Sequence, residues 1–95
     1  MAKYSKSEVL VKLKSLAGWS LEGEEIKKRY EFSSFPDAMK FVSKVADLAE
    51  RADHHPDILI NYRRVTLTLS THSEGGITQK DFDLAEEIER ESGSR

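Results

Sequence analysis

The sequence predicts an α+β fold, in which a four-stranded antiparallel sheet carries its helices on one face. Three stretches begin with capping residues and continue as helices, while four shorter runs alternate between apolar and polar residues. The expected element order is α-β-β-α-β-β-α. We expect residues 1–95 to form a single domain, because a chain of this length suits one modest core.

The first helix is expected to begin after Ser5 and to end at Gly18. Ser5 and Glu8 match a capping box, in which each side chain accepts a hydrogen bond from the other residue's backbone amide. Tyr4 and Val9 flank this box as a hydrophobic staple. The apolar face of the helix is supplied by Val9, Leu10, Leu13 and Leu16.

A β-hairpin is expected next, with its turn at Gly23. Residues Trp19–Glu22 form its short strand and residues Glu24–Phe32 its longer strand. One face of the longer strand carries Ile26, Lys28, Tyr30 and Phe32. Lys28 therefore stands in an otherwise apolar row.

The second helix is expected over Phe35–Arg51, with Ser34 as N-cap and Pro36 in its first turn. Its apolar residues cover about half of the helical wheel, whereas packing on one sheet needs a stripe of roughly 100°. The apolar face is therefore broader than the sheet alone can cover. This predicts that a second partner, most simply another subunit, also packs on the helix, with Val45 and Leu48 facing outward. The alternative is that this helix packs on both the sheet and a neighbouring helix of the same chain.

The two remaining strands, Asp57–Tyr62 and Arg64–Thr71, are expected to form a hairpin that turns at Tyr62–Arg63. Alternate residues of the second strand share one face: Val65, Leu67, Leu69 and Thr71. The open ends of the hairpin should bring Pro56 next to Thr71, to within a residue or two of register.

The last helix is expected to open at Thr78, with Asp81 as the partner in its capping box, and to run to Arg90. A turn over Ser73–Gly76 precedes it, and residues 91–95 are expected to be a frayed tail.

Composition excludes several classes of function. Charged residues make up 34% of the chain, but both signs are interspersed and the net charge is −2, so we expect no direct nucleic-acid binding. There is no cysteine, hence no disulfide and no thiolate chemistry. No apolar run approaches the ~18 residues of a membrane span and no signal peptide is apparent, so we expect a cytoplasmic protein without membrane contact.

The acid–base chemistry of the chain is concentrated in one segment, which holds all three histidines. Pro56 ends the second helix and favours an extended backbone at His55, so the side chains of His54 and His55 should point in opposite directions. The hairpin places His72 at the same end of the sheet. The sequence therefore predicts that the three imidazoles gather near one another.

Three interpretations of this gathering remain open from the residues alone. Each histidine could be an ordinary surface residue or cap. A three-histidine metal site is compatible with the ligand type, but the usual i,i+4 or i,i+2 spacing is missing. Proton transfer to a bound small molecule is the third, with Asp53, Glu50 and Asp81 available to orient the imidazoles.

The spacing of residues in this segment resembles the signature of the pterin-4a-carbinolamine dehydratases, and the similarity covers about residues 8–90. The matching positions are Glu50, His54, His55, Pro56, Tyr62, His72 and Asp81. The resemblance implies a hydro-lyase that converts 4a-hydroxytetrahydropterin, as in 4a-hydroxytetrahydrobiopterin, to quinonoid dihydropterin plus water, in tetrahydropterin recycling. It further implies a homodimer or homotetramer that needs neither metal nor cofactor.

The resemblance also implies roles for individual residues. His54 and His72 would transfer protons, and His55 would mainly bind the pterin. Glu50 and Asp81 would support or orient the histidines. The remaining substrate contacts would come from Asp53, Ser70, Thr71, Ser73 and Trp19.

A second class of function stays open beside the enzyme. Some members of the family act as a dimerisation cofactor for a transcription factor, so the fold could serve as a non-catalytic pterin-binding or protein-interaction module. The intact set of three histidines favours the enzyme, because an adaptor has no physical need for them.

Overall fold

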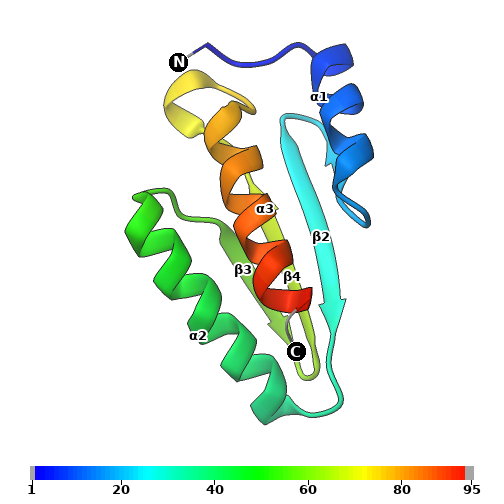
Figure 1. Ribbon diagram of the computed structural model, residues 1–95, viewed down its shortest axis with the longest axis vertical. Coiled ribbons are helices and arrows are strands. Elements are labelled where there is room, and N and C mark those ends of the chain that lie inside the picture. The colour runs from blue at the N-terminus through cyan, green and yellow to red at the C-terminus, as the bar shows by residue number, and fades with distance from the viewer. Residues whose placement is uncertain (1, 94–95) are drawn as a thin grey trace.

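A four-stranded antiparallel sheet with strand order β1-β2-β4-β3 organises the computed structural model, which describes residues 2–93. The strands are β1 (Ser20–Glu22), β2 (Glu25–Glu31), β3 (Asp57–Asn61) and β4 (Arg64–Leu69). The helices are α1 (Lys6–Lys12), α2 (Phe35–Ala52) and α3 (Gln79–Gly93), with the 3-10 turns η1 (Leu13–Ser15) and η2 (His72–Glu74). Figure 1 shows α2 and α3 side by side across one face of the sheet, so the predicted α+β fold is confirmed.

The helix starts lie where the capping residues predict them. Ser5 and Glu8 form the complete capping box of α1, with N–H···O distances of 3.2 Å and 2.8 Å. Ser34 accepts the amide of Asp37 at 3.2 Å and caps α2. The end of the first helix differs from the prediction, because α1 tightens into η1 after Lys12.

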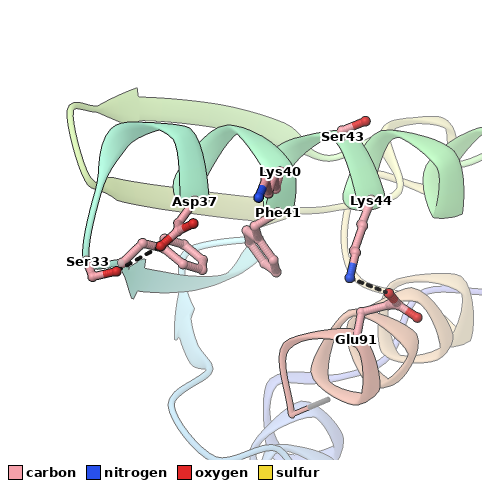
Figure 2. A pocket seen from close by; sticks show the side chains of 8 residues that line it. Ser33, Asp37, Lys40, Phe41, Ser43, Lys44 and Glu91 are labelled. Carbon is pink, nitrogen blue, oxygen red and sulfur yellow. Dashed lines mark hydrogen bonds and ion pairs between the residues drawn. The ribbon is translucent and has the colours of Figure 1, made fainter. Parts of the chain in front are cut away.

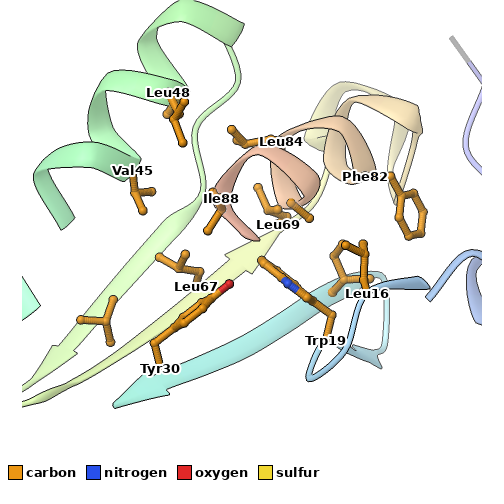
Figure 3. Close-up of a cluster of buried hydrophobic side chains, with 14 of the residues drawn as sticks. Leu16, Trp19, Tyr30, Val45, Leu48, Leu67, Leu69, Phe82, Leu84 and Ile88 are labelled. Atoms are coloured by element: carbon orange, nitrogen blue, oxygen red, sulfur yellow. The ribbon is translucent and has the colours of Figure 1, made fainter. Parts of the chain in front are cut away.

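The core lies between the sheet and the two long helices. Alternate residues of β4 point into it, which confirms the predicted period of two for this strand. Figure 3 shows side chains of α2, α3, β4 and the segment around Trp19 meeting in one cluster. The buried apolar residues of α3 and of the sheet include Ile26, Val65, Leu67, Leu69, Leu84, Ala85 and Ile88.

The apolar residues of α2 that are buried and those that are exposed differ from the prediction. Val45 and Leu48 are buried and point into the core, so the expectation that they face outward is wrong (Figure 3). The large apolar side chains of α2 that do face outward are Phe35, 44% exposed, and Met39, 36% exposed. Because α2 contacts both β4 and α3, the broad apolar face is partly explained by packing within the chain.

The β3–β4 hairpin turns at Tyr62–Arg63, as predicted, with Tyr62 in the left-handed region at φ 54°. Its register pairs Asp57 with Thr68, which sets Pro56 opposite Leu69. The predicted neighbour of Pro56, Thr71, is therefore two residues beyond this pairing, which is within the residue or two of register that the prediction allowed.

The C-terminal helix is longer than predicted. α3 continues to Gly93, three residues beyond Arg90, so residues 91–93 of the expected frayed tail are helical and residues 94–95 lie outside the described part. Over the described range, no helix is both long and apolar enough to span a bilayer.

Lys28 has a partner that explains its place in an apolar row. The Oε2 atom of Glu89, on α3, accepts hydrogen bonds from Lys28 Nζ at 2.8 Å, from Trp19 Nε1 at 3.1 Å and from the hydroxyl of Tyr30. Burial raises the pKa of Glu89, but these hydrogen bonds and the charge of Lys28 outweigh it and hold the pKa below its usual value. This cluster ties α3 to β2 and to the start of β1.

Candidate active site

A cavity of about 310 Å³ lies at the end of the sheet where α2 finishes and α3 begins. Three segments line it: the turn after α2, the stretch from β4 into η2, and the first turn of α3. The lining residues are Asp53, His54, His55, Ser70, Thr71, His72, Ser73 and Lys80. The predicted meeting of the three histidines is therefore observed.

The turn after α2 presents the histidine pair. Asp53 caps the helix in the left-handed region, at φ 51° and ψ 43°, which Asp adopts more readily than most residues. Its amide donates to the carbonyl of Glu50 at 3.2 Å, and the amide of His54 donates to the carbonyl of Ala49 at 3.1 Å. These bonds close the helix end and fix the direction in which the chain leaves it.

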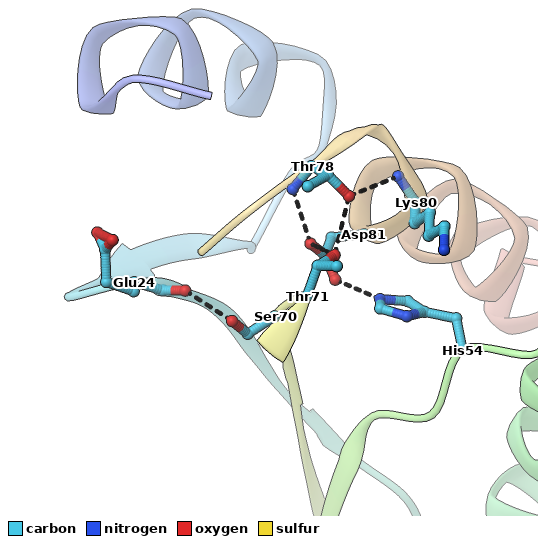
Figure 4. A network of polar contacts seen from close by, with 7 residues as sticks. All are labelled: Glu24, His54, Ser70, Thr71, Thr78, Lys80 and Asp81. Carbon is cyan, nitrogen blue, oxygen red and sulfur yellow. Dashed lines mark hydrogen bonds and ion pairs between the residues drawn. The ribbon is translucent and has the colours of Figure 1, made fainter. Parts of the chain in front are cut away.

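His54 is held by a buried carboxylate. Its Nε2 atom lies 2.5 Å from Oδ1 of Asp81, and the two side chains are 11% and 0% exposed. The other oxygen of Asp81 accepts from Thr71 Oγ1 at 2.8 Å and from the Thr78 amide at 2.9 Å (Figure 4). Because an ionised carboxylate only accepts hydrogen bonds, this contact assigns the proton to Nε2 and makes Nδ1 the acceptor atom of the ring.

The other two histidines are more exposed than His54. The Nε2 atom of His55 lies 2.7 Å from Glu50 Oε1, with side chains 57% and 79% exposed. The neighbouring imidazoles thus bond to different carboxylates, on α3 and on α2. His72 begins η2, and within residues 2–93 its imidazole makes no side-chain hydrogen bond.

Hydrogen bonds hold the loop that carries His72 at both of its ends. The hydroxyl of Ser70 donates to the carbonyl of Glu24 at 3.0 Å, which ties the end of β4 to the β1–β2 turn. The amide of Tyr4 donates to the carbonyl of Ile77 at 2.7 Å, and its hydroxyl donates to Gln79 Oε1 at 2.5 Å. The N-terminal segment therefore fixes the far side of the loop.

One predicted substrate contact lies elsewhere. Trp19 is buried in the core, where its indole donates to Glu89, and it does not line the cavity. Glu50 lies against His55, as expected of a supporting residue, and does not itself line the cavity. Sequence reasoning missed two contributors: Lys80, which lines the cavity, and the Thr78 side chain, whose hydroxyl lies 2.8 Å from that of Thr71. Their positions beside Asp81 in the predicted capping box are the signal that could have found them.

A larger cavity of about 590 Å³ lies between the start of α2 and the end of α3 (Figure 2). It is lined by Phe32, Ser33, Asp37, Lys40, Phe41, Ser43, Lys44 and Glu91. Its lining contains no histidine, and Lys44 lies 3.8 Å from Glu91 in an ion pair. Volume alone would favour this cavity, but the proton-transfer groups line the smaller one.

The family model described as pterin 4 alpha carbinolamine dehydratase matches residues 2–91. A relative from Roseiflexus sp. (strain RS-1) is 53% identical over 87 residues, covering 92% of this chain and 94% of the relative. One from Sulfolobus acidocaldarius is 44% identical over 88 residues, covering 93% and 97%. Both carry the name "Putative pterin-4-alpha-carbinolamine dehydratase".

Solved structures agree with these relatives. The crystal structure of a transcriptional coactivator/pterin dehydratase from Brucella melitensis matches with a TM-score of 0.88 and 37% identity, covering 93% of this chain and 96% of that one. A pterin dehydratase-like protein described as a RuBisCO assembly factor in the alpha-carboxysome matches with a TM-score of 0.60 and 22% identity, covering 74% and 81%, which shows a likeness of fold alone. The predicted resemblance is confirmed, and the chain belongs to the pterin-4-alpha-carbinolamine dehydratase family of hydro-lyases.

Proposed function

We propose that this protein dehydrates 4a-hydroxytetrahydropterins to quinonoid dihydropterins, with His54 and His72 as the proton-transfer groups. The observation that carries the proposal is the His54–Asp81 contact in a cavity that is also lined by His72, whose imidazole has no side-chain hydrogen bond within the described residues. The imidazole of His54 is held in place and that of His72 is exposed. A reaction with two proton transfers needs two such groups.

The chemistry requires a proton to be delivered and another to be removed. The C4a–O bond breaks, and the leaving hydroxyl takes a proton and departs as water. The N5–H bond gives up its proton, and the electron pair at N5 forms the C4a=N5 double bond. Two groups placed on different sides of the ring can perform these steps, each contributing about 10²–10⁴-fold.

His54 suits the base role. Asp81 holds Nε2–H, so Nδ1 presents its lone pair and can accept the N5 proton. The negative charge of Asp81 then stabilises the imidazolium that forms. His72, exposed at the start of η2, is the proposed donor to the hydroxyl. A substrate with the opposite configuration at C4a would exchange the two roles.

The remaining lining residues are proposed to bind the pterin ring. The aminopyrimidinone edge presents N–H donors, which suit the carboxylate of Asp53 and the oxygen atoms of Ser70, Thr71 and Ser73. His55 is proposed to contact the ring from the side, with Glu50 holding its Nε2. The proposed mechanism uses no metal and no cofactor.

The biological setting is part of the same proposal. The quinonoid product can be reduced to tetrahydropterin, so the reaction would serve tetrahydropterin recycling in the cytoplasm. We propose a homodimer or homotetramer, because α2 leaves the large apolar side chains of Phe35 and Met39 exposed in the single chain.

A stopped-flow experiment tests the proposal. The decay of a freshly formed 4a-hydroxytetrahydropterin is followed by absorbance with and without the protein. We expect acceleration that saturates with substrate, and its loss in the double variant His54→Ala/His72→Ala. A decay rate that stays at the uncatalysed value in the presence of the folded protein would contradict the proposal.

The second candidate is a non-catalytic pterin-binding or protein-interaction module. The name of the Brucella melitensis structure as a transcriptional coactivator favours it, together with the exposed apolar residues of α2. This candidate predicts that the protein binds a pterin, as measured by the fluorescence of the pterin, while the dehydration rate stays at the uncatalysed value.

A further inference from the structure

Lys80 is a cation in the histidine cavity that the sequence did not point to. It occupies the first turn of α3, where its amide donates to Thr78 Oγ1 at 3.2 Å, and its side chain lines the cavity. Figure 4 shows Lys80 extending from α3 on the side of Asp81 where His54 lies. Among the residues that line the cavity, Lys80 is the lysine and Asp53 is the carboxylate.

The charge of Lys80 has no carboxylate partner within residues 2–93. Lys3, Lys27, Lys28 and Lys44 each pair with a glutamate, whereas Lys6, Lys12, Lys14 and Lys40 share with Lys80 the lack of an ion pair within the described residues, but none of these four lines the histidine cavity. A cation in the first turn of a helix is also disfavoured by the helix dipole. Within residues 2–93 no ion pair holds Lys80, so its charge is available to a ligand in the cavity.

The connectivity of a pterin shows which part of it this charge would meet. The aminopyrimidinone edge, proposed to meet Asp53, is at one end of the bicycle, and C6 is at the other, bonded to N5. If Nδ1 of His54 serves N5, the C6 substituent lies near His54, because C6 is bonded to N5, and Lys80 lines the same cavity.

We propose that Lys80 is a specificity-determining residue that favours pterins whose C6 substituent carries an anionic group, either a carboxylate or a phosphate ester. An ammonium group attracts either anion, whereas a neutral hydroxylated substituent gains one hydrogen bond. This inference rests on the proposed function of the cavity, and it adds the class of substrate that the cavity prefers.

The test compares matched substrates that differ only at C6. The value of kcat/KM is measured for 4a-hydroxytetrahydropterins carrying hydroxymethyl, its phosphate ester, or a carboxylate, and the two anionic substrates distinguish phosphate from carboxylate selection. We expect Lys80→Gln to lower the ratio of anionic to neutral kcat/KM by roughly three- to tenfold, and Lys80→Glu to lower it further. Lys80→Arg should retain the ratio.

Lys14→Gln is the matched control, since Lys14 is exposed and does not line the cavity. It should leave the ratio unchanged, and salt should lower the ratio in the wild type more than in Lys80→Gln. An equal ratio in wild type and Lys80→Gln, with anionic and neutral substrates turned over, would overturn the inference. If no substrate is turned over, the proposed function fails. The ratio of anionic to neutral affinity is then measured from the binding of 6-carboxypterin and 6-hydroxymethylpterin, followed by pterin fluorescence. An affinity ratio that Lys80→Gln leaves unchanged would also overturn the inference.

Discussion

The imidazole of His54 and the carboxylate of Asp81 meet at 2.5 Å, although 27 residues separate them in the sequence. The same carboxylate accepts the amide of Thr78 at the start of α3 and the hydroxyl of Thr71 at the end of β4. One buried side chain therefore orients the proposed base, begins a helix and anchors a strand end. The site and the fold are coupled at this point.

Replacing Asp81 by Asn should reduce activity more than stability. The amide group can still accept from the Thr78 amide, but its NH₂ group would face His54 and favour the tautomer with the proton on Nδ1. We expect kcat to fall by about 10²–10⁴-fold. Asp83→Asn, on the exposed side of the same helix, is the control. Wild-type kcat in a folded Asp81→Asn variant would show that Asp81 only caps α3.

His55 should affect substrate binding rather than the chemical step. Its contact with Glu50 is largely exposed, so it contributes at most about 1 kcal/mol to stability. His55→Ala is expected to raise KM with kcat changed by less than about threefold, because interactions equal in the ground and transition states appear in KM. Steady-state kinetics on this variant and on Glu50→Gln check the assignment. A loss of kcat as large as that of His54→Ala would make His55 a proton-transfer group instead.

Glu89 should make the fold sensitive to acid. Because its pKa in the folded protein is below the unfolded value of about 4.3, its ionisation stabilises the fold above that pH, and the stabilisation is lost as pH falls through the lowered pKa. Glu89→Gln should cost about 1–3 kcal/mol of unfolding free energy at pH 7, and the difference from wild type should shrink below pH ~4. Urea unfolding at several pH values measures it.

The exposed residue Glu86, on the same helix, gives the control for that experiment. Glu86→Gln should change the unfolding free energy by less than about 0.5 kcal/mol at every pH. A difference between wild type and Glu89→Gln that stays constant from pH 7 to pH 3 would show that the ionisation of Glu89 is not what stabilises the cluster.

Assembly, if it uses α2, should depend on the residues that the structure leaves exposed. Met39→Asp is expected to shift a dimer or tetramer toward monomer at micromolar concentration, as measured by light scattering, since a specific interface buries about 800 Å² per subunit. Lys40→Asp introduces the same carboxylate beside it as a control. A monomeric wild type, or a Met39→Asp variant that assembles normally, would contradict this. Val45→Asp should instead unfold the chain, because Val45 is in the core.

Features that depend on neighbours in the sequence could be predicted. The Ser5–Glu8 box and the Ser34 cap involve residues three positions apart, and the turn at Tyr62–Arg63 joins adjacent strands. The meeting of His54 with His72 followed from that turn alone, since pairing β3 with β4 brings their open ends together.

Features that depend on distant partners could not be predicted. Trp19 and Lys28 take their places from Glu89, which is 70 and 61 residues away, and no spacing in the sequence encodes that meeting. The wheel of α2 showed how broad its apolar face is, but not which part of that face would meet β4 and α3, where Val45 is buried and Met39 is not.

The central claim is that His54 and His72 transfer the protons, and single-turnover rates of water loss from the 4a-hydroxytetrahydropterin test it most directly. His54→Ala and His72→Ala are measured at saturating protein, with circular dichroism to confirm folding. We predict that each change lowers the rate by roughly one to three orders of magnitude, about 1.4–4 kcal/mol of barrier. Rates equal to wild type in both variants would contradict the acid–base assignment and favour the non-catalytic module.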